Sequence, residues 1–540
     1  DGLVEAFEEA INDGGEGGVC VRLFEILKAA TGKGKKIKWR GRKQEGKTPY
    51  KGRSKPPVKL SSLYRGGDKG RGVVAGAKPV LEEVRAQAAA TNGRKETFPD
   101  VARELMACIR PFPEQRPARP DWTDDVCTWE RFERAVGRAG ADVGVGADGY
   151  CGYLMRKAPL AVQRLYFDAL RDVLASHDFP PEWKLWECVL MMKPGEDPRD
   201  FGRRRDIWLM PHSLKVAARM LMCEFEGVCD GYVPASQSGF SQDANAPAQT
   251  LVMRMHRERC HRNRQGYYVA YADMGTYFMS ICTEIMHLAE QWTGTRVEVS
   301  AVLRAMQDGL HGRVETAYGM TSPHAMPGVA CGQGHECSPV RSKIMASFIQ
   351  AMASQVCRGY RFGQTGTPQC WYADDSAWLC EDLAGVQMAL DAMWVVARVS
   401  GLKVTIKDKD FATRVGSKTA WMGVYYDENG RECEVTGAEV VLPDNRKVPQ
   451  VREYKYLGTP LRVAYAGRHD AMRGKVVSTC SALLRRIGRV DLLGPRQMRR
   501  VMELAVAGVL GYYCRSTPMT WADCERIEVV RASVLAERGM

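Results

Sequence analysis

Two adjacent carboxylates, Asp374 and Asp375, are the strongest candidates for chemistry in this chain of 540 residues. They follow Tyr372 and Ala373, and the flanking residues are aromatic or apolar. Adjacent carboxylates in apolar surroundings repel each other and are costly to bury unless cations neutralise them. A pair of Mg²⁺ ions would do so, and two-metal phosphoryl transfer requires such a carboxylate platform. By itself, the Tyr-x-Asp-Asp pattern is also compatible with an ordinary acidic turn.

A third carboxylate, Asp273, ends the short apolar and aromatic segment Tyr267–Asp273, which is predicted to be a strand. A carboxylate at a strand end can bridge both metal ions together with the hairpin pair. Phe278 follows five residues later, where its ring can lie against the sugar of a bound nucleotide. Taken alone, Asp273 is equally compatible with an acid near a helix N-terminus.

The elements that must position these residues are predicted from periodicity, caps and turn residues. Strands are expected at Trp186–Met192, at Tyr267–Asp273, on both sides of the acidic turn within Cys370–Cys380, and on both sides of Asn429-Gly430. Helices are expected at Leu160–Ser176 with Pro159 opening the first turn, at Tyr277–Trp292, at Ser338–Cys357, between Asp382 and Gly401, and over the last eighty residues. This alternation favours an α+β core over a doubly wound parallel sheet.

Positive charge is concentrated near the beginning of the chain. The net charge is +13, and the segment Lys33–Lys59 holds twelve Lys or Arg against one Glu, a local net charge of +11. The segment is poor in aliphatic residues, so it is not expected to fold on its own. It is interpreted as a flexible phosphate-binding arm or nuclear-localisation patch, with a solvated linker as the alternative.

The eighteen cysteines are scattered, and no CxxC pair occurs, which argues against a zinc knuckle and for reduced, intracellular thiols. No run of about 18 apolar residues is present, and the most apolar helix candidate, Val501–Tyr513, is too short to span a bilayer. The chain begins at Asp1 without a leader, so it is expected to be a fragment of a longer, non-membrane polypeptide.

An ordered set of motifs resembles the reverse transcriptases, most closely those of non-LTR (LINE-type) retrotransposons. The motifs cover the following positions in order: Gly146–Tyr150, Trp183–Lys193, Arg205–Ile207, Lys215, Gln237–Phe240, Asp273–Phe278, Gln333–Pro339, Tyr372–Asp375, Gly401–Val404 and Tyr454–Leu461. The resemblance implies a right-hand polymerase with fingers, a palm with an antiparallel sheet, and a helical thumb. It also implies this division: 1–115 basic, partly disordered extension and linker; 116–260 fingers; 261–445 palm; 446–540 primer grip and thumb.

The resemblance implies a role for each matched residue. Asp273, Asp374 and Asp375 would hold two Mg²⁺ ions as the catalytic set. Phe278 would exclude a 2′ hydroxyl by size, making the substrate a deoxynucleoside triphosphate. The other residues implied to bind the nucleotide are Lys193, Arg205, Gln333, Gly334 and Lys418, and those implied to form the primer grip are Tyr456, Leu457 and Gly458.

Some positions depart from the family pattern. Asp206 stands where the family has Pro, and Met279 where an acid is usual. The basic residue after the Gly401 motif could be Lys407, Lys409 or Lys418; Lys418 is favoured because Thr419–Tyr425 then reads as the following strand. No endonuclease or RNase H signature is recognised, so a nuclease would come from another part of the polypeptide or from a partner.

The sequence therefore predicts an RNA-directed DNA polymerase that copies an RNA template from a DNA primer or nicked target DNA in the nucleus. A viral-type RNA-dependent RNA polymerase is disfavoured by Phe278 and by the Tyr-Ala-Asp-Asp sequence. The alternative from another class is a catalytically inactive, domesticated RNA-binding scaffold with the same fold.

Overall fold

The computed structural model describes residues 62–65, 73–93, 95–113, 118–138, 146, 152–192, 197, 199–201, 204–234, 236–240, 246–357, 369–416, 418–466, 469–490, 494–514 and 517–539. The basic segment Lys33–Lys59, residues 147–150 and Lys193 lie outside the described residues. The chain divides into two units. Unit 1 comprises Asp1–Val233, Thr276–Phe348 and Arg398–Leu402, and unit 2 comprises Pro234–Gly275, Ile349–Ala397 and Lys403–Met540.

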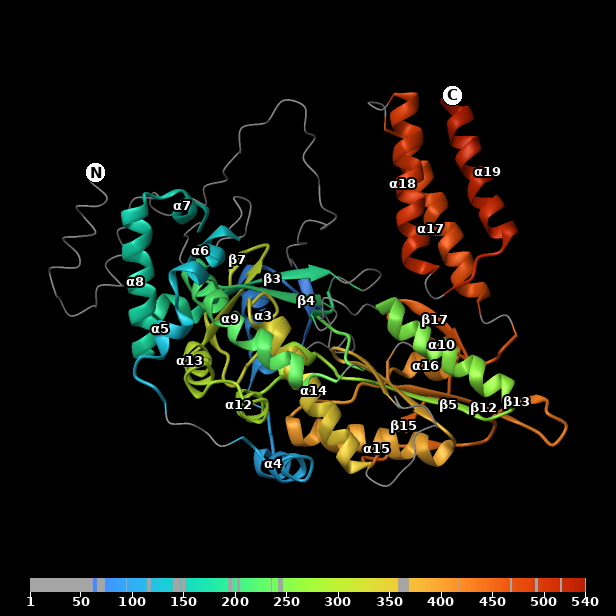
Figure 1. The fold of residues 1–540 in the computed structure, drawn as a ribbon, viewed down its shortest axis with the longest axis horizontal. Helices are drawn as coiled ribbons and strands as arrows, with labels where there is room; N and C mark the ends of the chain where they lie inside the picture. Colours follow the sequence, from blue (N-terminus) through green and yellow to red (C-terminus); the bar gives the residue numbers. More distant parts are fainter. Residues whose placement is uncertain are drawn as a thin grey trace. The chain divides into compact units, whose positions relative to one another are not determined.

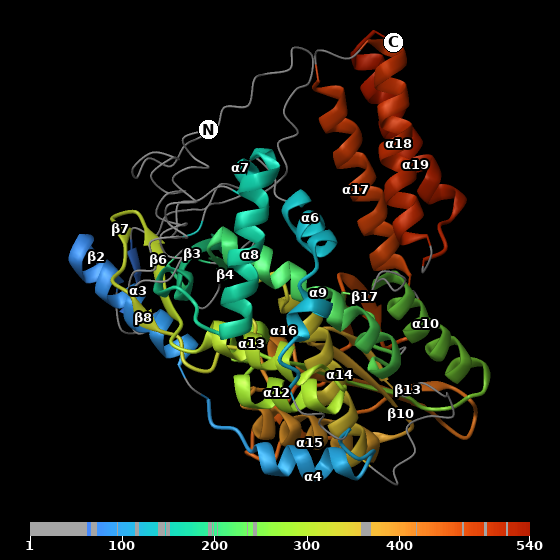
Figure 2. The ribbon, with the colours of Figure 1, turned by 60° about the vertical axis from the view of Figure 1, so that its left-hand side comes forward.

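Unit 1 is built around a mixed sheet in the order β4-β3-β6-β7, with β8 also paired to β6. Strand β3 is antiparallel to β4 and parallel to β6. Figure 2 shows α3 beside β6 and β8. The strands are β1 (Ser62–Tyr64), β2 (Val73–Ala75), β3 (Leu185–Met192), β4 (Arg204–Leu209), β6 (His311–Thr316), β7 (Gly319–Met320) and β8 (His324–Ala325).

The helices of unit 1 contact the sheet or one another. They are α3 (Ala77–Asn92), α4 (Pro99–Ala107), α5 (Trp122–Val126), α6 (Trp129–Gly137), α7 (Gly152–Lys157), α8 (Leu160–Ser176), the 3-10 turn η3 (Pro181–Lys184), α9 (His212–Tyr232), α11 (Tyr277–Ser280), α12 (Thr283–Trp292) and α13 (Val297–Gln307). Helix α14 (Ser338–Val356) begins in unit 1 and ends in unit 2.

Unit 2 contains an antiparallel five-stranded sheet in the order β13-β12-β5-β10-β9. Its strands are β5 (Tyr267–Asp273), β9 (Gln369–Tyr372), β10 (Asp375–Cys380), β12 (Ala420–Tyr426) and β13 (Glu432–Glu434). The smaller pairings of this unit use β11 (Val415–Gly416), β14 (Val440–Val441), β15 (Lys447–Val448), β16 (Glu453–Tyr456) and β17 (Thr459–Arg462). Helix α16 (Asp408–Thr413) precedes β11.

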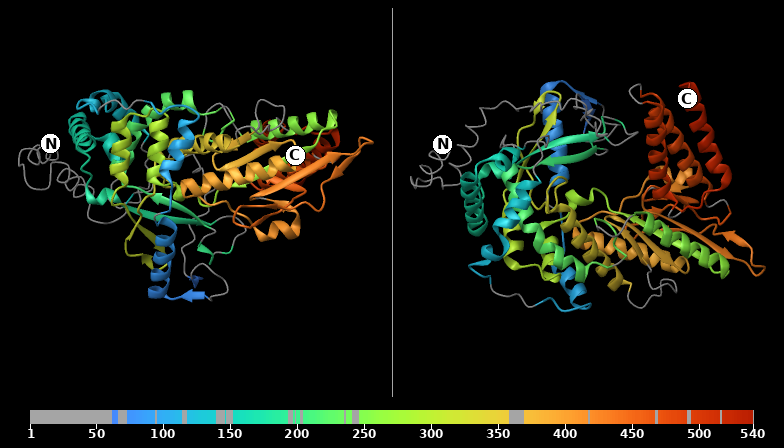
Figure 3. Two further views of the ribbon diagram at one scale, coloured as in Figure 1. Left: turned by 90° about the horizontal axis from the view of Figure 1, so that it is seen from below. Right: turned by 45° about the horizontal axis from the view of Figure 1, so that its top comes forward.

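Both faces of this sheet are buried, because successive residues of a strand point to opposite faces and nearly all residues of β5, β10 and β12 are buried. Tyr267, Val269 and Tyr271 of β5 belong to a core that also includes Met253 of α10 (Ala246–Arg262) and Leu461 of β17. Helix α15 (Leu383–Ser400) lies on the other side of the sheet from α10 (Figures 1 and 3). The carboxylate Asp273 shares the face of Tyr271, since it lies two residues further along β5.

The C-terminal part of unit 2 is a three-helix bundle made of α17 (Asp470–Gly488), α18 (Pro495–Tyr513) and α19 (Trp521–Glu537). The helices lie side by side, as Figures 1 and 2 show. Their core contains Met472, Val476, Leu484, Met498 and Met502, together with residues of α19. Thr520 caps α19, because its side chain accepts a hydrogen bond from the Asp523 amide and Asp523 bonds back to the Thr520 amide.

The structure is a mixed α+β protein, as the sequence predicts. The predicted bounds of the helix Leu160–Ser176 and the strand Tyr267–Asp273 agree with α8 and β5. The predicted helix between Asp382 and Gly401 is α15: the Gly385 amide donates to Asp382 Oδ1 at 2.8 Å, and Gly401 ends the helix with φ 72°.

Two predictions about helices are wrong. The expected helix Tyr277–Trp292 is two helices, because Ile281 is extended (φ −64°, ψ 115°) and its carbonyl accepts from the Ala330 amide at 2.9 Å. This backbone pairing, which includes the bridge between Cys282 and Val329, outweighs the local helical preference. Pro159 does not open the first turn of α8 but precedes it as the N-cap residue, with ψ 149°.

One helix in the part of the chain that the structure describes, α15, is long and apolar enough to cross a membrane by length and composition alone. More than half of it (56%) is buried inside the protein, a property it shares with core helices. Among the described helices, the one that meets the length and composition of a membrane span is thus α15. The segment Val501–Tyr513, the most apolar helix expected from the sequence, forms part of α18.

Candidate active site

The hairpin β9–β10 and its neighbour β5 bring two of the predicted carboxylates directly opposite each other. Asp375 is the first residue of β10 and Asp273 the last residue of β5, and the two are cross-strand partners in the antiparallel register. On its other side Asp375 pairs with Tyr372. Directly opposed residues of an antiparallel pair have Cβ atoms only about 5 Å apart. The fold thus places the two carboxylates within reach of one ligand.

Asp374 lies in the two-residue turn that joins β9 to β10. The turn residue before it, Ala373, has φ 55°, the left-handed conformation that an L-residue with a side chain rarely adopts. Ala373 is 5% exposed, whereas Asp374 is half-buried. The turn therefore places Asp374 next to the cross-strand pair Asp273–Asp375. The left-handed conformation of Ala373 must be stabilised by contacts with neighbouring residues.

The backbone of Asp273 is fixed from two directions. Its amide donates to Thr419 Oγ1 at 3.1 Å, and its carbonyl accepts from the Thr405 amide at 3.0 Å. The residue is 3% exposed. These bonds fix the end of β5 against the segments that flank α16 and β11, so the position of the Asp273 carboxylate does not depend on β10 alone.

Lys418 forms an ion pair with Asp273 Oδ1. The lysine comes two residues before β12, which pairs with β5, and its side chain is 29% exposed. Lys418, the lysine favoured from the sequence, therefore contacts a predicted catalytic carboxylate. Its ammonium group contacts an oxygen atom that a metal ion would also use.

Burial and neighbouring charges of the same sign set the electrostatics of the site. Burial, together with the neighbouring Asp374 and Asp273 carboxylates, raises the pKa of Asp375 to about 7, and Lys418 offsets part of this increase. Carboxylate oxygens are the ligands that Mg²⁺ prefers, so the chemistry of the donor set fits divalent metal ions. As the side chains stand, no group of three His, Cys, Asp or Glu among the described residues is arranged to hold a metal ion. The Lys418 ammonium group lies against Asp273 in this arrangement.

The predicted primer-grip residues form the hairpin β16–β17. Leu457 (φ 47°) and Gly458 (φ 78°) are the two left-handed residues of its turn, as a type I′ hairpin turn requires. Tyr456 is 1% exposed, and its hydroxyl donates to the Cys370 carbonyl at 2.9 Å. The neighbouring Tyr454 stacks on Tyr271 with ring centroids 3.7 Å apart. Tyr456 is therefore a buried anchor, and the turn Leu457-Gly458 is the part that can face a ligand.

Unit 1 brings together three of the other predicted nucleotide-binding residues. The Gln333 carbonyl accepts from the Trp208 amide at 2.7 Å, and Trp208 lies three residues after the exposed Arg205 on β4. Gly334 has φ 114°, and a Cβ atom there would lie 2.3 Å from the Trp208 carbonyl oxygen. Only glycine fits this close approach, so the Gln333-Gly334 loop is fixed at the end of β4.

Phe278 is half-buried in the short helix α11, where its ring makes an edge contact with Tyr277 at 5.7 Å. Tyr277 in turn donates to the Ser342 carbonyl at 2.8 Å. The ring of Phe278 thus packs against the buried Tyr277, and part of the ring remains exposed to solvent.

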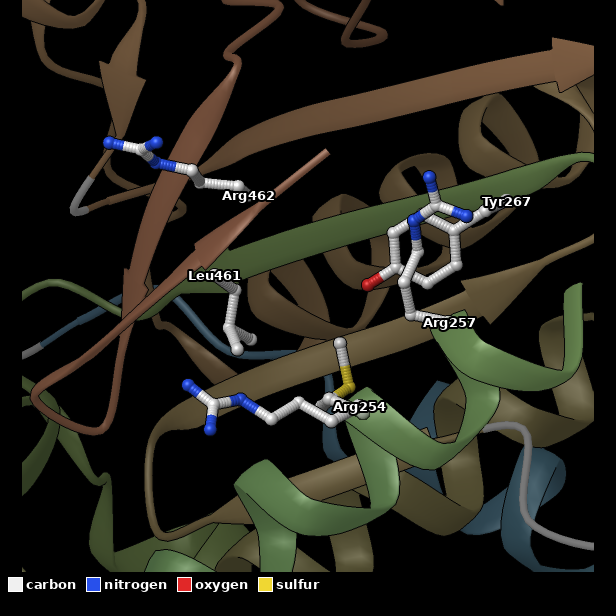
Figure 4. A pocket seen from close by; sticks show the side chains of 6 residues that line it. Arg254, Arg257, Tyr267, Leu461 and Arg462 are labelled. Carbon is white, nitrogen blue, oxygen red and sulfur yellow. The ribbon is translucent and has the colours of Figure 1, made fainter. Parts of the chain in front are cut away.

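A small pocket elsewhere in unit 2 lies between α10 and β17 (Figure 4). Three of its lining residues are arginines: Arg254, Arg257 and Arg462. The Arg257 side chain is 4% exposed, pairs with Glu432, and donates from Nε to the Val463 carbonyl at 3.0 Å. Because the charge of Arg257 is already matched by Glu432, we interpret this arginine as a structural link between α10 and the strands.

The sequence did not assign roles to two residues that the structure places at the carboxylates. Thr419 Oγ1 accepts a hydrogen bond from the Asp273 amide. The Gln237 side chain accepts a hydrogen bond from the Ala373 amide and donates one to the Ala373 carbonyl. Gln237 belongs to a matched motif, so a signal was present, but sequence spacing could not show what it contacts 136 residues further along the chain.

A scan against protein-family models matches no family, and a search of the curated proteins finds no matching relative.

Proposed function

We propose that this chain is an RNA-directed DNA polymerase of the non-LTR retrotransposon type, with the right-hand architecture of fingers, palm and thumb. One observation carries the proposal: Asp273 and Asp375 face each other across β5 and β10, with Asp374 in the adjoining turn. Three carboxylates that raise one another's cost of ionisation are expensive unless a cation-dependent function retains them. Many two-metal enzymes use such carboxylates. We favour a polymerase among them because the ordered sequence motifs around the three aspartates resemble those of reverse transcriptases.

In this proposal, the three aspartates and Lys418 would have the following roles. Asp273, Asp374 and Asp375 would hold two Mg²⁺ ions. Bound there, the ions would lower the pKa of the primer 3′ hydroxyl and bind the triphosphate of the incoming deoxynucleotide. Asp273 would exchange its contact with Lys418 for a contact with metal, which frees the lysine to meet the triphosphate.

The remaining residues would bind and select the nucleotide. The exposed Arg205 guanidinium is suited to bidentate phosphate contact. Gln333 and Gly334 would contact the nucleotide through their fixed loop, and Phe278 would reject a ribose 2′ hydroxyl by size. Lys193 would add a phosphate contact, and the turn Leu457-Gly458 would support the primer DNA opposite an RNA template.

Primer extension tests the proposal. The full chain is incubated with an RNA template, an annealed DNA primer, labelled deoxynucleotides and Mg²⁺, beside Asp374→Asn. We expect extension by the wild type and none by the variant, and replacing deoxynucleotides with ribonucleotides should reduce the product strongly. Wild-type protein that binds RNA without extending the primer would reject the polymerase.

The ion pair between Lys418 and Asp273 is the observation that favours the second candidate, an RNA-binding scaffold without catalysis, because the pair can stabilise the carboxylates without metal. The two candidates differ in their response to metal. A polymerase should be stabilised against heat by Mg²⁺ in a manner that Asp374→Asn removes. A scaffold should show RNA binding and no such stabilisation.

A further inference from the structure

The segment Ser236–Phe240 runs alongside β9 and contacts the turn that carries Asp374. The Trp371 amide donates to the Ser236 carbonyl, and the Ser238 amide donates to the Trp371 carbonyl, both at 2.9 Å. Gln237 thus forms an isolated parallel bridge with Trp371 of β9, the edge strand of the sheet. The segment is itself held, because Gln350 Nε2 donates to Ser236 Oγ at 2.6 Å.

The Gln237 side chain forms hydrogen bonds with the turn at both the amide and the carbonyl of Ala373. Its Oε1 accepts the Ala373 amide at 3.0 Å and the Gly239 amide at 2.8 Å, and its Nε2 donates to the Ala373 carbonyl at 3.5 Å. Gln237 is 2% exposed, so these bonds do not compete with bulk water. Ala373 is the residue with φ 55°, the conformation that needs support from its surroundings.

Gly239 completes the contact by allowing close approach. A Cβ atom at this position would lie 2.4 Å from the Ala373 nitrogen and 3.0 Å from Gln237 Oε1. Any larger residue would therefore push the segment away from the turn. The spacing Gln-x-Gly thus supplies both the acceptor and the space that the turn requires.

We propose that Gln237 is a positioning residue which, through its carboxamide, fixes the turn Ala373-Asp374 and thereby sets the affinity of the three aspartates for divalent metal. The proposal rests on the proposed function for the identity of the metal ligands. Gln237 does not touch metal or substrate; it acts through the backbone of the residue before Asp374. Residues that orient metal ligands in this indirect way typically change metal affinity by 10–100-fold when they are replaced.

The test is Mn²⁺ binding to the full chain, followed by electron paramagnetic resonance, for the wild type and three variants. Gln237→Leu removes every bond to the turn and should weaken Mn²⁺ binding about 10–100-fold. Gln237→Glu keeps the acceptor oxygen for both amides and should bind Mn²⁺ more nearly as the wild type does. Gln369→Leu is the matched control, because Gln369 is a buried glutamine of β9 that bonds to Trp371 and Ser354 rather than to the turn.

Equal Mn²⁺ affinity in Gln237→Leu and the wild type would overturn the proposal, and so would an equal loss in Gln237→Leu and Gln369→Leu. If Gln237→Leu does not fold, Gly239→Ala replaces it: the added methyl group should push the segment away from the turn and weaken Mn²⁺ binding while the Gln237 carboxamide itself is kept, and wild-type affinity in that variant would overturn the proposal. Primer extension separates the two claims. A wild type that binds Mn²⁺ in this Gln237-dependent way but extends no primer would refute the polymerase and leave the positioning role standing.

Discussion

Two groups of charged side chains, one from each unit, are arranged in contrasting ways. In unit 1, the Arg341 guanidinium and the Glu290 carboxylate are 2% and 1% exposed and 2.7 Å apart, and Arg341 also donates to the Ala330 carbonyl at 2.7 Å. In unit 2, three carboxylates lie at one end of the five-stranded sheet with Lys418 against Asp273, and burial and the other two carboxylates raise the pKa of Asp375 to about 7.

The contrast separates structural charge from functional charge. A buried pair of opposite sign, with its remaining hydrogen-bond capacity filled, satisfies itself and needs no ligand. A group of like sign cannot do so, because each carboxylate raises the cost of ionising the next. The first arrangement is expected to matter for folding, and the second for metal binding and catalysis. Four substitutions test this distinction.

The largest effect is expected on activity, from Asp375→Asn. Primer extension should fall more than about 1,000-fold, equivalent to about 4 kcal/mol in the activation barrier, because the variant loses one of the three carboxylates that would hold the metal ions. Without metal, the thermal midpoint should be unchanged or higher, because one of the mutually repelling charges is removed. If the variant loses activity only because its thermal midpoint falls, Asp375 is needed for folding, which contradicts the functional role assigned to this carboxylate.

The largest effect on stability is expected from Arg341→Met. The substitution leaves the Glu290 carboxylate buried without its partner, which typically costs about 3–5 kcal/mol. Urea denaturation measures the loss. The double variant Arg341→Met, Glu290→Gln should recover a large part of it, because no buried charge then remains. Simple addition of the two single losses would show that the pair is not the source of the effect.

A smaller effect is expected from protonation next to this pair. Burial, and to a lesser extent Arg341, lower the pKa of His335 to about 3. The folded form therefore holds a neutral imidazole, whereas the unfolded chain takes up a proton below about pH 6.5. Stability is thus present above pH 6.5 and is lost as the pH falls, by about 2 kcal/mol at pH 5 from this group. His335→Gln should reduce the difference between urea midpoints at pH 7 and pH 5, and an unchanged difference would contradict the buried neutral state.

The smallest effect is expected where an ion pair is exposed. Lys447 and Glu439 are 60% and 63% exposed, so solvent already screens both charges. Lys447→Ala should change the free energy of unfolding by less than about 1 kcal/mol. A loss as large as that of Arg341→Met would show that burial is not what distinguishes the charge sites of this chain.

Local sequence predicted much of the framework that carries the site. The strand Tyr267–Asp273 has an apolar run of the right length and a carboxylate at its end, and α15 has a cap at Asp382 and a stop at Gly401. These signals lie within a few residues of the elements they define. The break at Ile281 had no such signal, because it depends on pairing with a segment almost fifty residues away.

The sequence by itself determined which residues are available for chemistry: an Asp at a strand end, two adjacent Asp at a hairpin, and the Gln-x-Gly segment before them. Tertiary structure decided their relations. Residue 273 faces residue 375 because of the register between β5 and β10, and Lys418 and Gln237 reach the same strand ends from distant parts of the chain. Register and long-range contact depend on how whole faces of a sheet are buried, which no short stretch of sequence specifies.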